Sequence, residues 1–448
     1  MLRLRNLRSR KIVSFQINKM SKKPSTPSNR PPSIDQIARA ISDLDLPHPL
    51  LVDAAREAVN NANGNDVVEE ARKIGEIISR TLLTDVINAT GVLLHTNMGR
   101  SPIKIESQNQ NFRFSNLELD LETGERGSRQ DRSSKLIARA CGAESALVVN
   151  NCASAVLLVI AALAEERGVA ISRSELVEIG GGFRIPEIIE QSGAQLIEVG
   201  TTNRTRRKDF EKAITKNDVS LVLKVHQSNY RIVGFTETTE ISEMTGLGVP
   251  LVADIGSGLI DSACPWLENG PPKWLIDEPA AKQSLESGAE IVTFSGDKLF
   301  GGPQAGIIAG KAELVELCAK HPMARVVRPG SLTLSALQDV TISYLERRAS
   351  SIPFWKMATS TVDELKIRAN KISKKCATET SATPGGGTLP GVEIPSAGLK
   401  LTGDHVEFFR QQNPPIICRV DNDQTFIDLM TVHPSDDVFI DNAIKKIQ

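Results

Sequence analysis

From Asp85 onwards, short apolar runs alternate along the chain with stretches of helical spacing. The apolar runs are SALVVNN (145–151), LVEIG (176–180), QLIEVGTT (195–202), SLVLKVHQS (220–228), PLVADIGSG (250–258), AEIVTFSG (289–296) and AGIIAG (305–310). Amphipathic stretches at 152–166, 184–192 and 207–215 lie between most of them. This alternation predicts right-handed βαβ units. We therefore expect an α/β fold with a mainly parallel sheet, helices on both of its faces, and a ligand site at the carboxyl ends of the strands.

The chain on either side of this region has a different pattern. Ser33 is a predicted N-cap before apolar residues at helical spacing, Pro47 to Pro49 interrupts the pattern, and helical stretches follow at 50–61 and 65–83. The last third opens with a helical segment at 331–375, followed by the turn-rich TPGGGTLPGVEIPS (383–396) and shorter strands. The predicted domains are a disordered basic tail (1–32), a helical domain (33–83), a core domain (84–330) and a C-terminal α/β domain (331–448).

Composition narrows the class of protein. The 448 residues carry a formal net charge of −1, which excludes a chain that is basic throughout. No apolar run is long enough to predict a membrane span. The six cysteines stand singly, with no CxxC pair, so neither a structural zinc site nor a thioredoxin motif is indicated. Reduced thiols of this kind are typical of a cytoplasmic protein.

The amino-terminal arm is the exception to this balance of charge. No acidic residue precedes Asp35, whereas many arginines and lysines do. Three explanations stay open: a disordered tail or an upstream extension with Met20 as the true start, an arm that contacts nucleic acid, or a targeting segment.

Polar residues follow three of the predicted strands. Asp254 ends one run, and a carboxylate there can hold a protonated ring nitrogen. Lys298 follows another, where apolar surroundings can lower the pKa of an amine enough for it to form a Schiff base. Asn151, Cys152 and Ala153 join a strand to a helix, and backbone N–H groups at a helix start can bind phosphate.

Three further residues fit the same ligand. Ser295 can add a hydroxyl to the phosphate site, His226 can stack on an aromatic ring, and Gly302 allows close backbone approach. Alone, a strand-end aspartate is more often a helix cap or ion-pair partner, and a lone lysine is usually solvated. A phosphate cradle, an acid for a ring nitrogen and a lysine in this chain order are together what pyridoxal phosphate (PLP) requires. No metal site is indicated.

Longer strings carry a resemblance to a known family. They are INATGVLLHTNMGR (87–100), ETGERGSRQDR (122–132), VVNNCASAVLL (148–158), RSELVEIGGGFRIPEII (173–189), EVGTTNRT (198–205), LKVHQSNYRIVGFT (223–236), DIGSG (254–258), FSGDKLFGGPQAGII (294–308) and GGGTLPGVEIPS (385–396). Through them the chain resembles, from about Pro32 to its end, the bacterial selenocysteine synthases, or L-seryl-tRNA(Sec) selenium transferases. These are fold-type I PLP-dependent enzymes, so the resemblance implies that fold and that cofactor.

The resemblance also implies an activity and roles for residues. The activity converts seryl-tRNA(Sec) to selenocysteinyl-tRNA(Sec) with selenophosphate, through a PLP-bound aminoacrylyl intermediate. Lys298, in SGDK, is the expected Schiff-base residue and proton carrier. Arg100 in NMGR, with Arg325 and Arg328 in MARVVR, forms the expected anion site, because planar guanidinium groups suit tetrahedral oxyanions such as selenophosphate.

The family further implies an assembly and a partner. It forms a homodecamer, a pentamer of dimers with sites at the dimer interfaces, in the cytoplasm. Its small N-terminal helical domain grips the tRNA, and residues 33–83 occupy that position.

The chain departs from the family pattern in three places. Residues 101–116 and 239–250 are short, and Ser331 lies where many members carry a further charged residue. Two other functions stay open: a related PLP lyase acting on a small amino acid or amino-sugar acid, and a tRNA-binding protein without catalysis. The helical segment 33–83 argues against the first, and the intact SGDK and DIGSG argue against the second.

Overall fold

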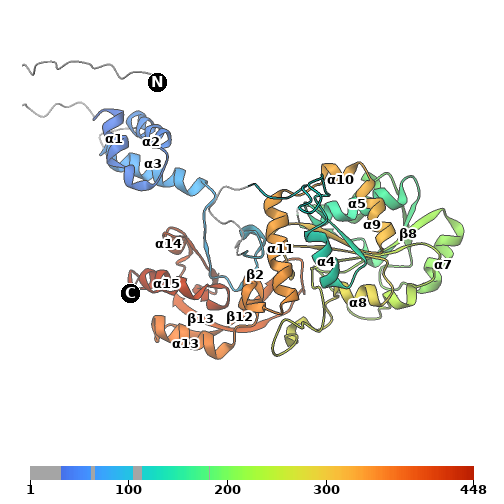
Figure 1. Cartoon of the computed structure of the whole chain (residues 1–448). Helices are drawn as coiled ribbons and strands as arrows, with labels where there is room; N and C mark the ends of the chain where they lie inside the picture. The colour runs from blue at the N-terminus through green and yellow to red at the C-terminus, as the bar shows by residue number, and fades with distance from the viewer. Residues whose placement is uncertain (1–31, 62–65, 104–113, 181, 448) are drawn as a thin grey trace, which may run out of the picture. The chain divides into compact units, whose positions relative to one another are not determined.

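The computed structural model describes residues 32–61, 66–103, 114–180 and 182–447. The chain divides into two compact units, Met1–Asp85 and Val86–Gln448 (Figure 1). Nearly all of the predicted basic tail and most of the shortened segment 101–116 lie outside the described residues. None of the described helices is long and apolar enough to cross a membrane.

The first unit consists of α1 (Ile34–Ala40), α2 (His48–Asn61) and α3 (Val67–Thr81). The predicted cap is confirmed: the Ser33 hydroxyl accepts from the Gln36 amide, and the Gln36 side chain accepts from the Ser33 amide. The helix α2 begins earlier than predicted, at His48, because Pro49 falls in its first turn, where a missing N–H breaks no helical bond. The unit has an apolar core of its own, which includes Ile37, Ile41, Ala54, Ala58 and Ile74.

The second unit is built on a seven-stranded sheet. In spatial order its strands are β3 (Ser145–Val149), β11 (Gly306–Gly310), β10 (Ile291–Ser295), β9 (Leu251–Gly256), β8 (Val219–Val225), β4 (Gly168–Ser172) and β7 (Gln195–Val199). Only β11 runs antiparallel to its neighbours in this sheet. The prediction of a mainly parallel sheet is therefore confirmed.

Helices cover both faces of this sheet, as predicted (Figure 1). On one face lie α5 (Cys152–Ala164), α6 (Ile185–Gln191), α9 (Ala312–Lys320) and α10 (Met323–Val326); on the other lie α4 (Ser133–Cys141), α7 (Arg207–Lys216), α8 (Ala281–Glu286) and α11 (Ser331–Leu345). Successive strand residues serve opposite faces: Leu147 and Val149 pack with α5, whereas Ala146 and Val148 pack with α4. Both faces of the sheet are therefore buried, which is why the strands have continuous apolar sequences.

Two local predictions were wrong. The run at 176–180 is not a strand of the main sheet, because β5 (Glu178–Ile179) pairs only with β6 (Phe183–Arg184) in a separate hairpin. The main-sheet strand is β4, which lies directly after the preceding helix and is buried throughout. The predicted helical segment 331–375 is also interrupted, by a 3₁₀ turn (Ala349–Ser351) and by Pro353, which starts a new helix.

A second sheet has the order β15 (Arg419–Asp421), β16 (Gln424–Asp428), β13 (Ile394–Thr402), β12 (Ala377–Gly385) and β2 (Val92–Leu94). Beside it lie α12 (Pro353–Ala358), α13 (Val362–Ser373), α14 (Val406–Arg410), α15 (Asp437–Lys445) and the short pair β1 (Ile87–Asn88) and β14 (Ile416–Ile417). The turn-rich stretch predicted at 383–396 holds the β12–β13 connection and the adjoining strand ends. Because β2 pairs in parallel with β12, residues from the start of this unit lie beside residues from its end.

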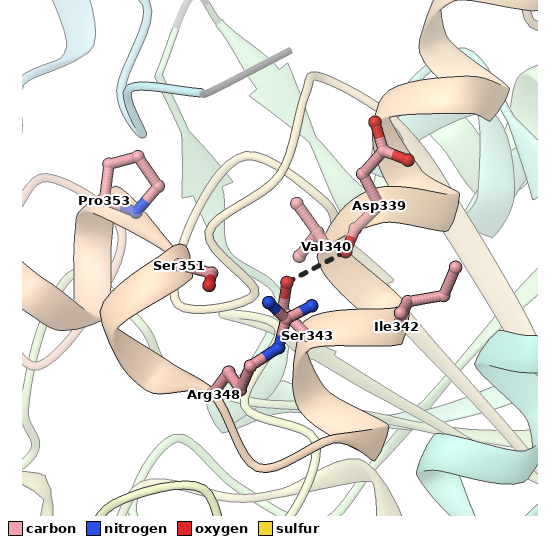
Figure 2. A pocket seen from close by; sticks show the side chains of 7 residues that line it. All are labelled: Asp339, Val340, Ile342, Ser343, Arg348, Ser351 and Pro353. Carbon is pink, nitrogen blue, oxygen red and sulfur yellow. Dashed lines mark hydrogen bonds between the residues drawn. The ribbon is translucent and has the colours of Figure 1, made fainter. Parts of the chain in front are cut away.

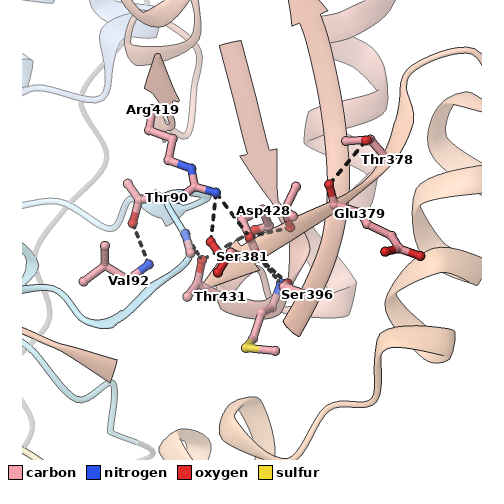
Figure 3. A network of polar contacts seen from close by, with 12 residues as sticks. Thr90, Val92, Thr378, Glu379, Ser381, Ser396, Arg419, Asp428 and Thr431 are labelled. Carbon is pink, nitrogen blue, oxygen red and sulfur yellow. Dashed lines mark hydrogen bonds and ion pairs between the residues drawn. The ribbon is translucent and has the colours of Figure 1, made fainter. Parts of the chain in front are cut away.

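The buried carboxylate of Asp428 ties these distant segments together (Figure 3). It accepts hydrogen bonds from the hydroxyls of Thr380 and Ser396, each at 2.6 Å, and from the Met430 amide at 3.0 Å. The Asp428 amide donates to the Ala89 carbonyl at 2.9 Å. A buried carboxylate is tolerated only when its oxygens are satisfied in this way. The network fixes the segment that leads through β2 towards Arg100.

Candidate active site

The carboxyl ends of β8, β9 and β10 bring the sequence-predicted residues together. Asp254, in β9, pairs in register with Val225 of β8 and with Thr293 of β10. His226 follows β8 directly, and its amide donates to the Asp254 carbonyl at 2.9 Å. Neighbouring parallel strands end at the same edge of a sheet, so side chains distant in sequence meet there.

Asp254 is a buried carboxylate, 5% exposed. Its Oδ1 accepts from the Thr293 hydroxyl at 2.9 Å and lies 3.6 Å from the Cys152 thiol. Burial raises the pKa of Asp254, while the Thr293 hydrogen bond and the nearby Lys298 charge act in the opposite direction. A buried carboxylate of this kind favours a cationic N–H donor as its partner.

Lys298 is also buried, 4% exposed, and its Nζ donates to the Gly387 carbonyl at 3.2 Å. Burial lowers the pKa of Lys298; the nearby Cys152 raises it, and the Arg100 charge lowers it further. A lowered pKa increases the fraction of neutral amine, which is the nucleophilic form.

The start of α5 joins the same cluster. The Asn151 side chain caps the helix by accepting from the Ser154 amide at 2.8 Å. The Cys152 thiol interacts with Asp254, Lys298 and Ser295, and burial raises its pKa well above the ordinary value. Because the first amides of a helix have no intrahelical acceptor, those of Cys152 and Ala153 are suited to an anion.

A pocket of about 600 Å³ opens at this edge of the sheet. Its lining includes Asp254, His226, Glu278, Lys224 and Leu389. A smaller pocket of about 80 Å³ lies between α11 and the start of α12, where the Ser343 hydroxyl donates to the Asp339 carbonyl of its own helix (Figure 2). None of the sequence-predicted site residues lines that smaller pocket. The larger pocket is the one that reaches the buried carboxylate.

Among the described residues, the three predicted arginines share no hydrogen-bond or ion-pair partner. Arg100 lies near Lys298: its Nη1 is 3.4 Å from the carboxylate of Asp297, the residue that precedes the lysine. Arg325, in α10, is exposed, and Arg328 lies 3.7 Å from Glu118. Among the described residues, no hydrogen bond or ion pair joins either of these two arginines to Lys298.

Gly302 lies in the turn that follows Lys298. Its amide donates to the Gly296 carbonyl at 2.8 Å, and a Cβ atom at this position would lie 3.1 Å from the Phe300 ring. The neighbouring Gly301 has φ +73°, and a Cβ there would come within 2.5 Å of Ile352. These glycines close a tight, packed turn, while the predicted contact of Gly302 with a cofactor stays a prediction.

Four residues at the site were not singled out from the sequence. Asp297 stands next to Lys298, and Thr293 stands two positions before Ser295 on the same strand. Their closeness in sequence to predicted site residues could have identified both. Gly387 and Glu278 reach the site from distant segments. No local pattern marks such residues.

Known proteins are similar to this chain over most of its length. A model of the SelA family of L-seryl-tRNA selenium transferases matches residues 86–433. The chain belongs to this family. A relative from Carboxydothermus hydrogenoformans, named L-seryl-tRNA(Sec) selenium transferase, is 44% identical over 373 residues, which cover 78% of each chain. A relative of the same name from Geobacter sulfurreducens is 36% identical over 92% of this chain and 96% of its own.

The matched range of this selenium transferase family begins where the second unit begins, and it contains every site residue described above. The Geobacter relative matches 92% of this chain, which is more than Val86–Gln448 makes up. The match therefore extends into the helical unit. A solved D-glucosaminate-6-phosphate ammonia-lyase is similar in fold, with a TM-score of 0.56 and 19% identity over 83% of this chain and 97% of its own. The predicted fold-type I architecture is confirmed.

Proposed function

We propose that the chain is an L-seryl-tRNA(Sec) selenium transferase that uses PLP and converts seryl-tRNA(Sec) to selenocysteinyl-tRNA(Sec). The observation that carries this proposal is the burial of Lys298 and Asp254 in one cluster, in a member of this family. When bound, PLP supplies an electron sink for the negative charge that develops at the seryl Cα.

The residues of the cluster fit this cofactor. Asp254 has the Thr293 hydroxyl, the Cys152 thiol and the Gly256 amide as neighbours, and no cationic group among the described residues donates a hydrogen bond to it, so a ring N–H would complete its surroundings. In this proposal Asp254 keeps the ring nitrogen protonated, and the amides of Cys152 and Ala153, with the Ser295 hydroxyl, bind the phosphate.

Lys298 has two tasks in this proposal. Its neutral amine would be the group that holds the cofactor covalently, and as a free amine it would take the proton from the seryl Cα. The lowered pKa suits both tasks, because only the neutral amine is a nucleophile or a base. The Gly387 carbonyl accepts from Nζ at 3.2 Å and so orients the free amine.

The selenium donor requires an anion site. We assign selenophosphate to Arg100, Arg325 and Arg328, whose forked guanidinium groups suit a tetrahedral oxyanion. Arg100 stands beside Asp297 and Lys298, whereas Arg325 is exposed and the partner of Arg328 among the described residues is Glu118, at 3.7 Å. This division supports a site in which Arg325 and Arg328 act in a second copy of the chain. The proposed assembly is a dimer that builds a decamer, located in the cytoplasm.

The helical unit is proposed to grip the tRNA. It has its own core, and the match to the Geobacter transferase extends into it. Several of its exposed basic side chains already pair with acids, as Arg72 does with Asp43, so specific docking rather than overall positive charge fits this unit.

The test is turnover of serylated selenocysteine tRNA with selenophosphate, with a serylated ordinary serine tRNA as control. The expected result is selenocysteinyl-tRNA from the first tRNA alone. Release of ammonia from a free amino acid or amino-sugar acid, with no selenium transfer, would instead favour the alternative lyase. Binding of the tRNA without either reaction would favour a protein that has lost catalysis.

A further inference from the structure

Glu278 is a buried carboxylate that the proposed chemistry does not use. Its side chain is 1% exposed, and neither carboxylate oxygen has a hydrogen-bond partner among the described residues. Burial of a carboxylate without a donor costs stability, so a partner is expected at this position. The neighbouring polar group is the imidazole of His226, whose Nε2 lies 3.4 Å from Glu278 Oε2 and has no hydrogen-bond partner among the described residues.

The backbone places Glu278 in this position. Asp277, just before it, has φ +70°, in the left-handed region that an L-residue other than asparagine or aspartate rarely adopts. The Glu278 amide donates to the Leu275 carbonyl at 3.3 Å, and Ala280 forms a bridge with Leu259. The turn therefore directs this side chain into the protein, while Asp277 remains exposed.

Hydrogen bonds hold the backbone of His226, while Glu278 is the polar side chain next to its imidazole among the described residues. The His226 amide donates to the Asp254 carbonyl, and its own carbonyl accepts from the Ser228 amide, both at 2.9 Å. Both His226 and Glu278 line the pocket that reaches Asp254. A ring that stacks on a cofactor must keep one plane, so its orientation needs a second support.

We propose that Glu278 is a positioning residue: it accepts a hydrogen bond from His226 Nε2–H and so fixes the imidazole plane against the PLP ring. The inference rests on the proposed function for the cofactor itself. Glu278 does not contact the reacting atoms, and it acts through His226. A small closure of the 3.4 Å separation completes the hydrogen bond.

The test measures PLP affinity of the full-length apoprotein by absorbance titration, together with the induced circular dichroism of the bound cofactor. Glu278→Leu is expected to weaken PLP binding about tenfold and to change the dichroism, because the ring loses its support. Glu278→Gln, whose amide oxygen still accepts from Nε2–H, is expected to bind within about threefold of wild type. The matched control is Glu286→Gln, which neutralises an exposed carboxylate at the end of α8, outside the pocket lining, and should change neither measurement.

The decisive comparison uses a His226→Phe background, in which the stacked ring has no N–H to support. There, Glu278→Leu should have no further effect on PLP affinity. An equal loss in both backgrounds, or wild-type affinity and dichroism in Glu278→Leu, would show that Glu278 is merely structural. Should Glu278→Leu not fold, Glu278→Ala takes its place, because it removes the carboxylate without adding bulk. If the wild-type apoprotein binds no PLP, the proposed function fails first and this inference fails with it.

Discussion

The amine of Lys298 donates a hydrogen bond to the carbonyl of Gly387, although 89 residues separate the two in the chain. Lys298 follows β10 of the seven-stranded sheet, and Gly387 lies in the connection between β12 and β13 of the second sheet. Gly387 has φ +83°, and a Cβ atom there would lie 3.3 Å from Lys298 Nζ. The two sheets therefore meet at the reactive amine.

Gly387→Ala is expected to lower the rate of transfer about tenfold, because the added methyl group displaces the Lys298 amine. Gly391→Ala is the matched control: Gly391 also has a positive φ of 74°, but a Cβ there meets nothing within 4 Å. Both variants carry a similar backbone strain, so only the contact with Lys298 differs. Steady-state kinetics on seryl-tRNA(Sec) check this, and equal losses in both variants would contradict it.

Lys298 should make the stability of the apoprotein depend on pH. Because burial lowers the pKa of Lys298 in the folded chain below the ordinary 10.5, the unfolded chain binds more protons between these two values. Stability therefore rises with pH across that window, and the penalty of the buried charge is fully present below it. Lys298→Met is expected to raise the free energy of unfolding of the apoprotein more at about pH 6 than at about pH 9. The difference should be about 1.4 kcal/mol for each pH unit of this range that lies above the pKa of Lys298 in the folded chain.

Denaturant unfolding at the two pH values measures this effect. Lys400→Met, at an exposed position on β13, is the control and should show no such dependence on pH. A gain for Lys298→Met that stays constant with pH would mean that the lysine is charged in the folded chain throughout the range.

Replacement of Arg325 or Arg328 by alanine is expected to raise the KM for selenophosphate about tenfold or more, while PLP affinity stays unchanged. Replacement by lysine should restore only part of the affinity, because an ammonium group cannot bind the oxyanion with two parallel hydrogen bonds. The exposed Arg410, on α14, serves as a control for the loss of a surface charge. An unchanged KM in both alanine variants would remove these arginines from the anion site.

Removal of the first unit should separate tRNA binding from cofactor binding. A chain of residues 86–448 keeps every site residue and the core of the second unit, so we expect it to bind PLP. It should lose affinity for selenocysteine tRNA about a hundredfold, because the proposed gripping unit is absent. Gel-shift titration measures the tRNA affinity and absorbance the cofactor; tRNA affinity equal to that of the full chain would refute the role of the helical unit.

The sequence alone determined the features that depend on local pattern. The alternation of apolar runs and amphipathic stretches predicted the parallel sheet with helices on both faces, and Ser33 was correctly placed as a cap. Lys298 and Asp254, which the structure places in one buried cluster, were singled out because strand-end polar residues stand out against apolar runs. The hydrophobic pattern did not predict β4. This short strand is buried throughout and follows the apolar helix α5 closely, so no alternation of apolar and polar residues marks it as a separate element.

The tertiary structure alone decided which distant residues meet. Strand order places Thr293 beside Asp254. The β12–β13 connection brings Gly387 to Lys298, and β12 itself pairs with β2 from the start of the unit. Apolar periodicity records which face of a strand is buried but not which strand lies next to it. The partners of a buried charge are therefore set by the fold as a whole.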